Sequence, residues 1–93
     1  MLLLDDTPLD WRPRSLADVA PEDFADVIRG GTAVSEFVLL GTGLAQSIPP
    51  RNVREALRGA GLGLEFMSTE GAARTYGVLV SEGRRVAVAL IAV

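Results

Sequence analysis

The fold class follows from one short stretch, Phe37-Val38-Leu39-Leu40 followed by Gly41-Thr42-Gly43. Four apolar residues in a row, without polar alternation, are typical of a strand that is buried on both faces of a sheet. The loop over residues 41–49 then ends this strand. Because a strand covered on both faces needs helices on each side, the stretch predicts an α/β protein.

Downstream of this loop, helices and strands alternate. Pro50 opens a helix whose apolar residues recur at i, i+3, i+4 and i+7, and Gly61 ends it. Residues 62–67 predict a strand, and residues 70–82 predict a helix with Thr69 as its N-cap. The apolar run over residues 86–93 predicts the last strand.

Upstream of the loop, residues 2–4 predict a short first strand, which the turn Asp5-Asp6-Thr7-Pro8 closes. Residues 21–29 predict a helix with acids in its first turn, ended by Gly30-Gly31. The predicted order is therefore β-α-β-α-β-α-β. We expect one domain over residues 1–93, with three layers and a central, largely parallel sheet covered by three helices.

The segment between the first strand and the first helix contains Trp11 and Pro13 and is predicted to be extended. These two residues suit a partner-binding edge of the protein. Equally, Trp11 suits a cover that packs on the sheet.

The composition excludes most classes of enzyme. The 93-residue chain has no His, Cys or Lys, so its nine basic residues are all Arg. Without His, the Ser-His-Asp triad and the usual general base at neutral pH are missing. Without Cys and His, the standard zinc sites and disulfides cannot form, and without Lys there is no Schiff base and no phosphate-loop lysine. We therefore expect a non-enzymatic protein with no metal and no cofactor.

The charge is unevenly distributed along the chain. Residues 1–28 carry seven acids against two Arg, a net charge of −5, whereas residues 29–93 carry seven Arg against five Glu, a net charge of +2. The overall charge of −3 argues against nucleic acid as a partner. The distribution fits either a solvated surface of mixed sign or a polarised surface that orients a protein partner.

The apolar segments are too short for a membrane span. A span needs about 20 apolar residues, and the longest uninterrupted run is residues 86–93. Residues 1–4 are followed at once by acids, unlike a signal peptide. We therefore expect a cytoplasmic protein that does not span a membrane.

Gly41-Thr42-Gly43 is the first candidate binding element, because ligands of α/β sheets gather where parallel strands end. Its two glycines allow close approach of an anion to the backbone. The dinucleotide fingerprint is incomplete, since Gln46 stands where a third glycine is needed. The loop is thus either a small-molecule or anion site or a tight structural turn.

Arginines supply most of the other candidates. Arg51, Arg54 and Arg58 recur on the polar face of the second helix, where they suit a small anion or an acidic protein. Alternatively, they form an exposed face that Glu55 partly neutralises. The third helix adds the candidates Arg74, Thr75 and Tyr76, although a tyrosine at this position also suits the core.

Four stretches, taken in order and spacing, point to a known family. They are Pro21-Glu22-Asp23-Phe24, Leu39-Leu40-Gly41-Thr42-Gly43, Val53-Arg54-Glu55-Ala56-Leu57-Arg58, and Ala72-Ala73-Arg74-Thr75-Tyr76 with Glu82-Gly83-Arg84-Arg85-Val86 after it. With them the chain resembles, over about residues 2–93, the small α/β proteins of the domain of unknown function 498 family. The resemblance implies a three-layer fold with a mixed sheet, in which the last strand runs antiparallel to its neighbours.

The resemblance also implies a function. The members of that family include mitochondrial respiratory complex I assembly factor three, which binds other proteins, and bacterial proteins that are often encoded near protein-export genes. No catalytic residue carries over, and the best-kept motifs of the family are those matched by residues 41–43 and 74–76. We therefore expect a protein-interaction or assembly-factor-like module in the biogenesis of membrane or respiratory complexes. The alternative is a small-molecule or anion-binding domain that uses the Gly41-Thr42-Gly43 loop.

The sequence departs from the family in two places. Relatives usually carry a longer N-terminal segment, a hairpin whose second strand matches residues 2–4. Either the natural chain starts upstream of Met1, or the sheet lacks an edge strand, and an exposed edge favours pairing with another chain, including a homodimer. In addition, Gly77 stands where relatives typically have Asn, which removes a side chain that would shape a pocket.

Overall fold

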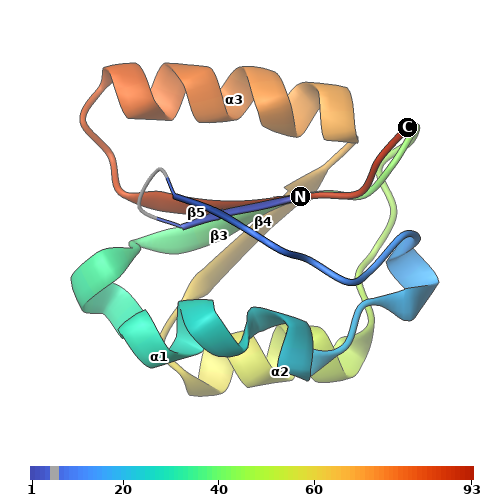
Figure 1. Ribbon diagram of the computed structural model, residues 1–93, viewed down its shortest axis with the longest axis horizontal. Helices are drawn as coiled ribbons and strands as arrows, with labels where there is room; N and C mark the ends of the chain where they lie inside the picture. The colour runs from blue at the N-terminus through green and yellow to red at the C-terminus, as the bar shows by residue number, and fades with distance from the viewer. Residues whose placement is uncertain (5–6) are drawn as a thin grey trace.

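The computed structural model describes residues 1–4 and 7–93 and arranges them in three layers. Figure 1 shows helix α3 over one face of a central sheet, and helices α1 and α2 over the other face. The strands are β1 (Leu2–Leu4), β2 (Thr7–Leu9), β3 (Phe37–Gly41), β4 (Gly63–Met67) and β5 (Val86–Leu90). The helices are α1 (Ala25–Val34), α2 (Arg51–Gly59) and α3 (Thr69–Ser81), with short 3₁₀ turns at Leu16–Asp18 and Pro21–Phe24.

The sheet is mixed, in the order β2-β1-β5-β3-β4. Strand β3 pairs in parallel with both β4 and β5, whereas β1 pairs antiparallel with both β5 and β2. The prediction of a mostly parallel sheet was therefore wrong. The expected direction of the last strand was half right, because β5 runs against β1 but alongside β3.

Strand β2 was not predicted. Asp5 and Asp6 of the predicted turn lie outside the described residues, whereas Thr7 and Pro8 belong to the strand itself. Pro8 is compatible with this position because β2 lies at one edge of the sheet, where an N–H can be missing. As a result β1 is an inner strand, and the exposed edge expected beside residues 2–4 is occupied by β2.

The core lies on both sides of β3, as its unbroken apolar run predicts. Val38 and Leu40 pack in the larger cluster on the side of α1 and α2, and Leu39 packs with Ala72 of α3 on the other side. All three β3 side chains are fully buried. Alternation along the strand thus supplies an apolar surface to each helix layer.

The helix boundaries differ from the predicted ones in detail. The predicted helix 21–29 begins as a 3₁₀ turn, and its predicted stop at Gly30-Gly31 coincides with a kink: Gly31 has the non-helical angles φ 58° and ψ −159°, and a further helical turn after it carries α1 to Val34. Helix α3 is capped by Ser68 and not by Thr69, because the Ser68 hydroxyl accepts the Gly71 N–H at 3.2 Å. The last strand ends at Leu90, before the predicted residue 93.

Trp11 covers the core. Its ring meets Phe24 edge-on, with the ring centroids 5.7 Å apart, and its indole N–H donates to the Asp23 carbonyl oxygen at 2.9 Å. The second of the two interpretations for this residue, a packing role, therefore describes the structure.

Candidate functional site

The loop after β3 is organised by Thr42. The Thr42 hydroxyl lies 2.7 Å from the Ala45 carbonyl oxygen and 3.0 Å from that of Met67, and it accepts the Ser47 N–H at 3.1 Å. The Thr42 backbone N–H also donates to Met67 at 2.8 Å. These bonds fasten the loop to the end of β4.

Thr69 fastens the same loop to the start of α3. Its hydroxyl accepts the Gly43 N–H at 3.0 Å and donates to the Ile91 carbonyl oxygen, while its own N–H donates to the Gly43 carbonyl oxygen at 2.8 Å. The Gly41 backbone packs against Thr69 so closely that a Cβ at position 41 would lie 2.8 Å from the Thr69 Cα. The ends of three parallel strands thus meet in one closely packed junction.

The geometry of this junction bears on the anion-binding hypothesis. Gly41, Thr42 and Gly43 are all buried, and the backbone N–H groups of Thr42 and Gly43 already donate to acceptors within the protein. An anion would have to displace these bonds to reach the loop. The arrangement matches the structural-turn alternative.

The outer part of the loop is different, because it presents apolar side chains to solvent. Leu44 is 90% exposed and Ile48 is 70% exposed. Between them, the side-chain amide of Gln46 donates to the Phe66 carbonyl oxygen of β4 at 3.2 Å. The loop is therefore fixed at its base by Thr42 and at its flank by Gln46, with two large apolar side chains uncovered.

The α2 arginines have different surroundings. Arg51 pairs with Glu55 on the same helix at 2.8 Å, and Arg54 donates to the Pro49 carbonyl oxygen at 3.2 Å. Arg58 is exposed and forms no ion pair with any described residue. Arg54 and Arg58 line a hollow of about 250 Å³ beside Leu64 and Phe66 of β4.

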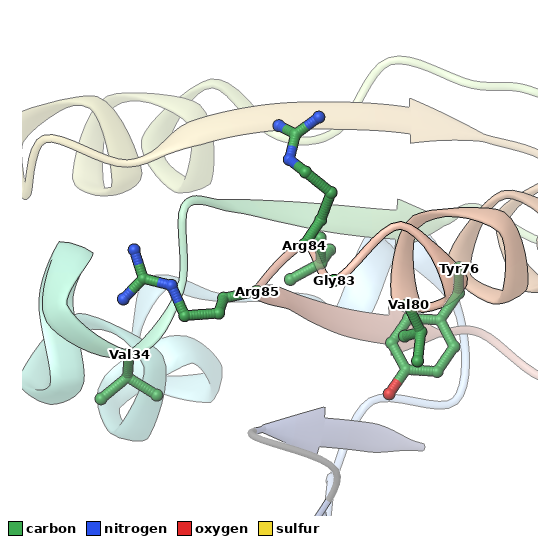
Figure 2. A pocket seen from close by; sticks show the side chains of 7 residues that line it. Val34, Tyr76, Val80, Gly83, Arg84 and Arg85 are labelled. Atoms are coloured by element: carbon green, nitrogen blue, oxygen red, sulfur yellow. The ribbon is translucent and has the colours of Figure 1, made fainter.

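The candidates on α3 lie on the opposite face of the sheet from α2. Arg74 is exposed beside Glu70, at 3.4 Å, and the Thr75 hydroxyl contacts the Met67 sulfur at 3.4 Å. Tyr76 lines a separate hollow, shown in Figure 2, together with Arg84 and Arg85. The nine predicted residues therefore fall into three groups, at the loop, on α2 and on α3.

The sequence interpretation missed a cluster at the start of β3 and β5. The Glu36 carboxylate accepts the Arg85 backbone N–H and the Arg84 side chain, both at 3.0 Å, and Arg85 also reaches the Ala33 carbonyl oxygen. The Arg85 N–H, with the Arg84 guanidinium, holds the pKa of Glu36 below its usual range. Because parallel neighbours begin at the same end of a sheet, the position of Glu36 just before one strand and of Arg84 and Arg85 just before another was a usable signal.

Two further features bear on function. Among the described residues, no group of three or more acidic side chains is placed to hold a metal ion. In the part of the chain that the structure describes, no helix is both long enough and apolar enough to cross a bilayer.

Comparison with curated proteins finds relatives that match part of the chain. The "13 kDa major membrane protein" of Francisella tularensis is 38% identical over 56 residues, which are 60% of this chain and 46% of that protein. The chain thus spans about half the length of the curated relatives it matches.

Solved structures are similar over nearly the whole chain. A protein of Rhodopseudomonas palustris has 38% identity and a TM-score of 0.83, over 99% of this chain and 67% of that one. A Bordetella pertussis protein described as a Mth938-like domain has 31% identity and a TM-score of 0.73, over 96% of this chain and 70% of that one. The family model "Protein of unknown function (DUF498/DUF598)" matches residues 1–91, and the chain therefore belongs to this family.

Proposed function

We propose that this protein is a non-enzymatic interaction module that binds another protein through the side of the molecule formed by the loop 41–49, α2 and β4. The observation that carries the proposal is the exposure of Leu44 and Ile48 on a loop that Thr42 fixes in place. Because the hydrogen bonds of Thr42 already fix the loop backbone, less backbone entropy is lost when a partner covers these apolar side chains. They therefore suit a protein surface as their ligand.

The side-chain inventory supports a binding role over a catalytic one. The chain has no His, Cys or Lys, and so lacks the residues that most often act as general base, thiol or amine nucleophile. The buried amides of Thr42 and Gly43 are already bonded, which weighs against the small-molecule alternative at the loop.

The resemblance to assembly factors and the name of the Francisella relative both suggest where such a module acts. We place its partner in a membrane-associated complex, which this chain joins from the cytoplasmic side during assembly. The partner's surface should cover Leu44 and Ile48 and should be apolar at that point.

The test is affinity capture from cytoplasmic and membrane fractions, quantified by mass spectrometry. The wild type is compared with the double variant Leu44→Ala/Ile48→Ala and with the matched control Val78→Ala/Val80→Ala. The control residues are 57% and 41% exposed on α3, so both variants lose two exposed apolar side chains. All three baits are first checked for folding by thermal denaturation.

We expect the wild type and the control to enrich the same protein, and the loop variant to recover at most a tenth as much of it. A tenfold rise in Kd, which corresponds to about 1.4 kcal/mol of binding free energy, would produce this loss. Equal capture by all three folded baits would contradict the proposed surface. Background recovery by all three would contradict the proposed function.

A further inference from the structure

The two edges of the sheet are protected to different extents. Strand β2 forms one edge; it has only three residues and contains Pro8, a residue that blocks further pairing. Strand β4 forms the other edge with five residues, Gly63-Leu64-Glu65-Phe66-Met67, which include neither Pro nor Lys. The open edge of this sheet is therefore β4.

The hydrogen bonds of β4 show which of its backbone groups face outward. The Met67 carbonyl oxygen accepts the Thr42 N–H, so the backbone groups of Met67 point toward β3. Because these directions alternate along a strand, the N–H and C=O of Leu64 and Phe66 point away from β3. The Gln46 side chain reaches the outward Phe66 carbonyl oxygen, as this alternation requires.

Positive charge lies beside this edge. Arg54 and Arg58 line the hollow next to Leu64 and Phe66, on the α2 side of the sheet. Arg58 has no ion-pair partner among the described residues, and the hydrogen bond of Arg54 goes to a neutral carbonyl group. Two guanidinium groups, neither paired with a carboxylate of the described residues, thus lie beside the outward-facing backbone groups of Leu64 and Phe66.

We propose that β4 binds an extended acidic segment of the partner protein, which adds to the sheet as an antiparallel strand and places carboxylates against Arg54 and Arg58. This inference rests on the proposed function and names the chemistry of the partner. Antiparallel pairing places bonded residues directly opposite each other with their side chains on the same face. The residues opposite Leu64 and Phe66 therefore both form the backbone bonds and direct their side chains to the arginine side, and the partner amide opposite Phe66 takes the place of the exposed Gln46 side chain at the Phe66 carbonyl oxygen.

A second copy of this chain fits the edge poorly. A two-fold pairing of β4 with β4 would place both α2 helices on the same side of the extended sheet. Arg54 and Arg58 would then face the same two arginines of the other copy, and like charges facing each other oppose association. An acidic segment matches this charge, whereas a second copy repels it.

The probe is a blocked heptapeptide, Glu-Val-Glu-Thr-Glu-Val-Glu, titrated into the isotope-labelled full chain and followed by amide NMR. We expect shifts in β4 and in Arg54 and Arg58, with a Kd that rises with salt. The same peptide with Gln in place of every Glu should bind about fivefold more weakly, since two exposed ion pairs are lost.

Two N-methylated versions of the peptide test the strand geometry. Methylation of the Glu amides removes the N–H groups that face β4 in an antiparallel pair, so binding should be lost. Methylation of the Val and Thr amides should preserve binding. If both versions bind as the parent peptide does, or both fail equally, strand addition is wrong.

Protein variants test the charge without changing the edge. Arg54→Gln/Arg58→Gln should raise the Kd of the parent peptide about fivefold. Arg51→Gln/Arg74→Gln, which removes the same charge elsewhere, should change it less than twofold. Equal effects of the two pairs would overturn the assignment of Arg54 and Arg58.

The two proposals fail in different ways. If affinity capture retains a partner that depends on Leu44 and Ile48 but the peptide leaves β4 unshifted, strand addition is refuted and the interaction module stands. If the chain alone is a dimer in light scattering, with β4 amides already protected from exchange, a second copy occupies the edge and the acidic segment is refuted.

Discussion

Replacing Gly41 with Ala should strongly destabilise the protein, although it adds only one methyl group. A Cβ at this position would come within 2.8 Å of both the Leu90 Cδ2 and the Thr69 Cα, and within 3.1 Å of the Thr69 hydroxyl oxygen. The Leu90 side chain can rotate away. Thr69 cannot move easily, because its hydroxyl and N–H are bonded to Gly43 and Ile91.

The size of the effect follows from this crowding. Extra atoms forced into a close-packed site cost about 1–3 kcal/mol, and contact with backbone places Gly41→Ala near the upper end of that range. For a domain of this length each kcal/mol lowers the melting temperature by about 4–8 °C. We therefore expect a decrease of about 10–20 °C, measured by far-ultraviolet circular dichroism.

The matched control is Gly77→Ala. A Cβ at Gly77 meets no atom within 4 Å, and the residue is exposed within α3. Alanine is favoured over glycine inside a helix by about 1 kcal/mol, so this variant should melt a few degrees higher than the wild type. A melting temperature of Gly41→Ala at or above that of the wild type, or shifts of the same sign in both variants, would refute the packing argument.

Three further results are expected. Thr42→Val should lower the free energy of unfolding by about 1–3 kcal/mol in urea denaturation, because the Ser47 N–H loses its acceptor, whereas Thr75→Val should be nearly neutral; equal losses would contradict the role of Thr42. The lowered pKa of Glu36 stabilises the folded state above the usual pKa of a glutamate, and this stabilisation is lost as the pH falls through the lower, folded-state pKa. Glu36→Gln should therefore flatten the acid side of the pH–stability profile, and an unchanged profile would speak against this linkage. Trp11→Phe should cost about 1 kcal/mol, since the hydrogen bond to the Asp23 carbonyl is lost; an unchanged urea midpoint would count against it.

Much of the fold could be predicted because apolar periodicity reports burial. The run from Phe37 to Leu40 is buried on both faces of the sheet. The helices predicted from the apolar periodicity of residues 50–60 and 70–82 correspond to α2 and α3. Strand direction could not be predicted in the same way, because a strand that is buried on both faces has the same apolar sequence pattern whether its neighbour is parallel or antiparallel. Strand β2 was missed because the sequence Asp5-Asp6-Thr7-Pro8 is typical of a turn, and Pro8 is compatible with a strand only at an edge of the sheet.

The candidate surface was less predictable. The residue types on the polar face of α2 were identified, but helical spacing does not show which strand lies beside Arg54 and Arg58. Nor does it show that α3 covers the opposite face, which separates Arg74 from that group. The burial of Gly41 and Gly43, and the bonds of Thr42 and Thr69 that hold the loop, depend on contacts between distant parts of the chain.

Hydrogen exchange at the Leu64 backbone amide tests the central claim, that the β4 edge is a binding surface, most directly. The rate is measured in the free full-length chain and in the chain saturated with the acidic heptapeptide. We predict that binding slows exchange at Leu64 and Phe66 at least tenfold and leaves exchange of the α3 amides unchanged. Unchanged exchange at Leu64 in a saturated sample, with protection elsewhere, would contradict the account.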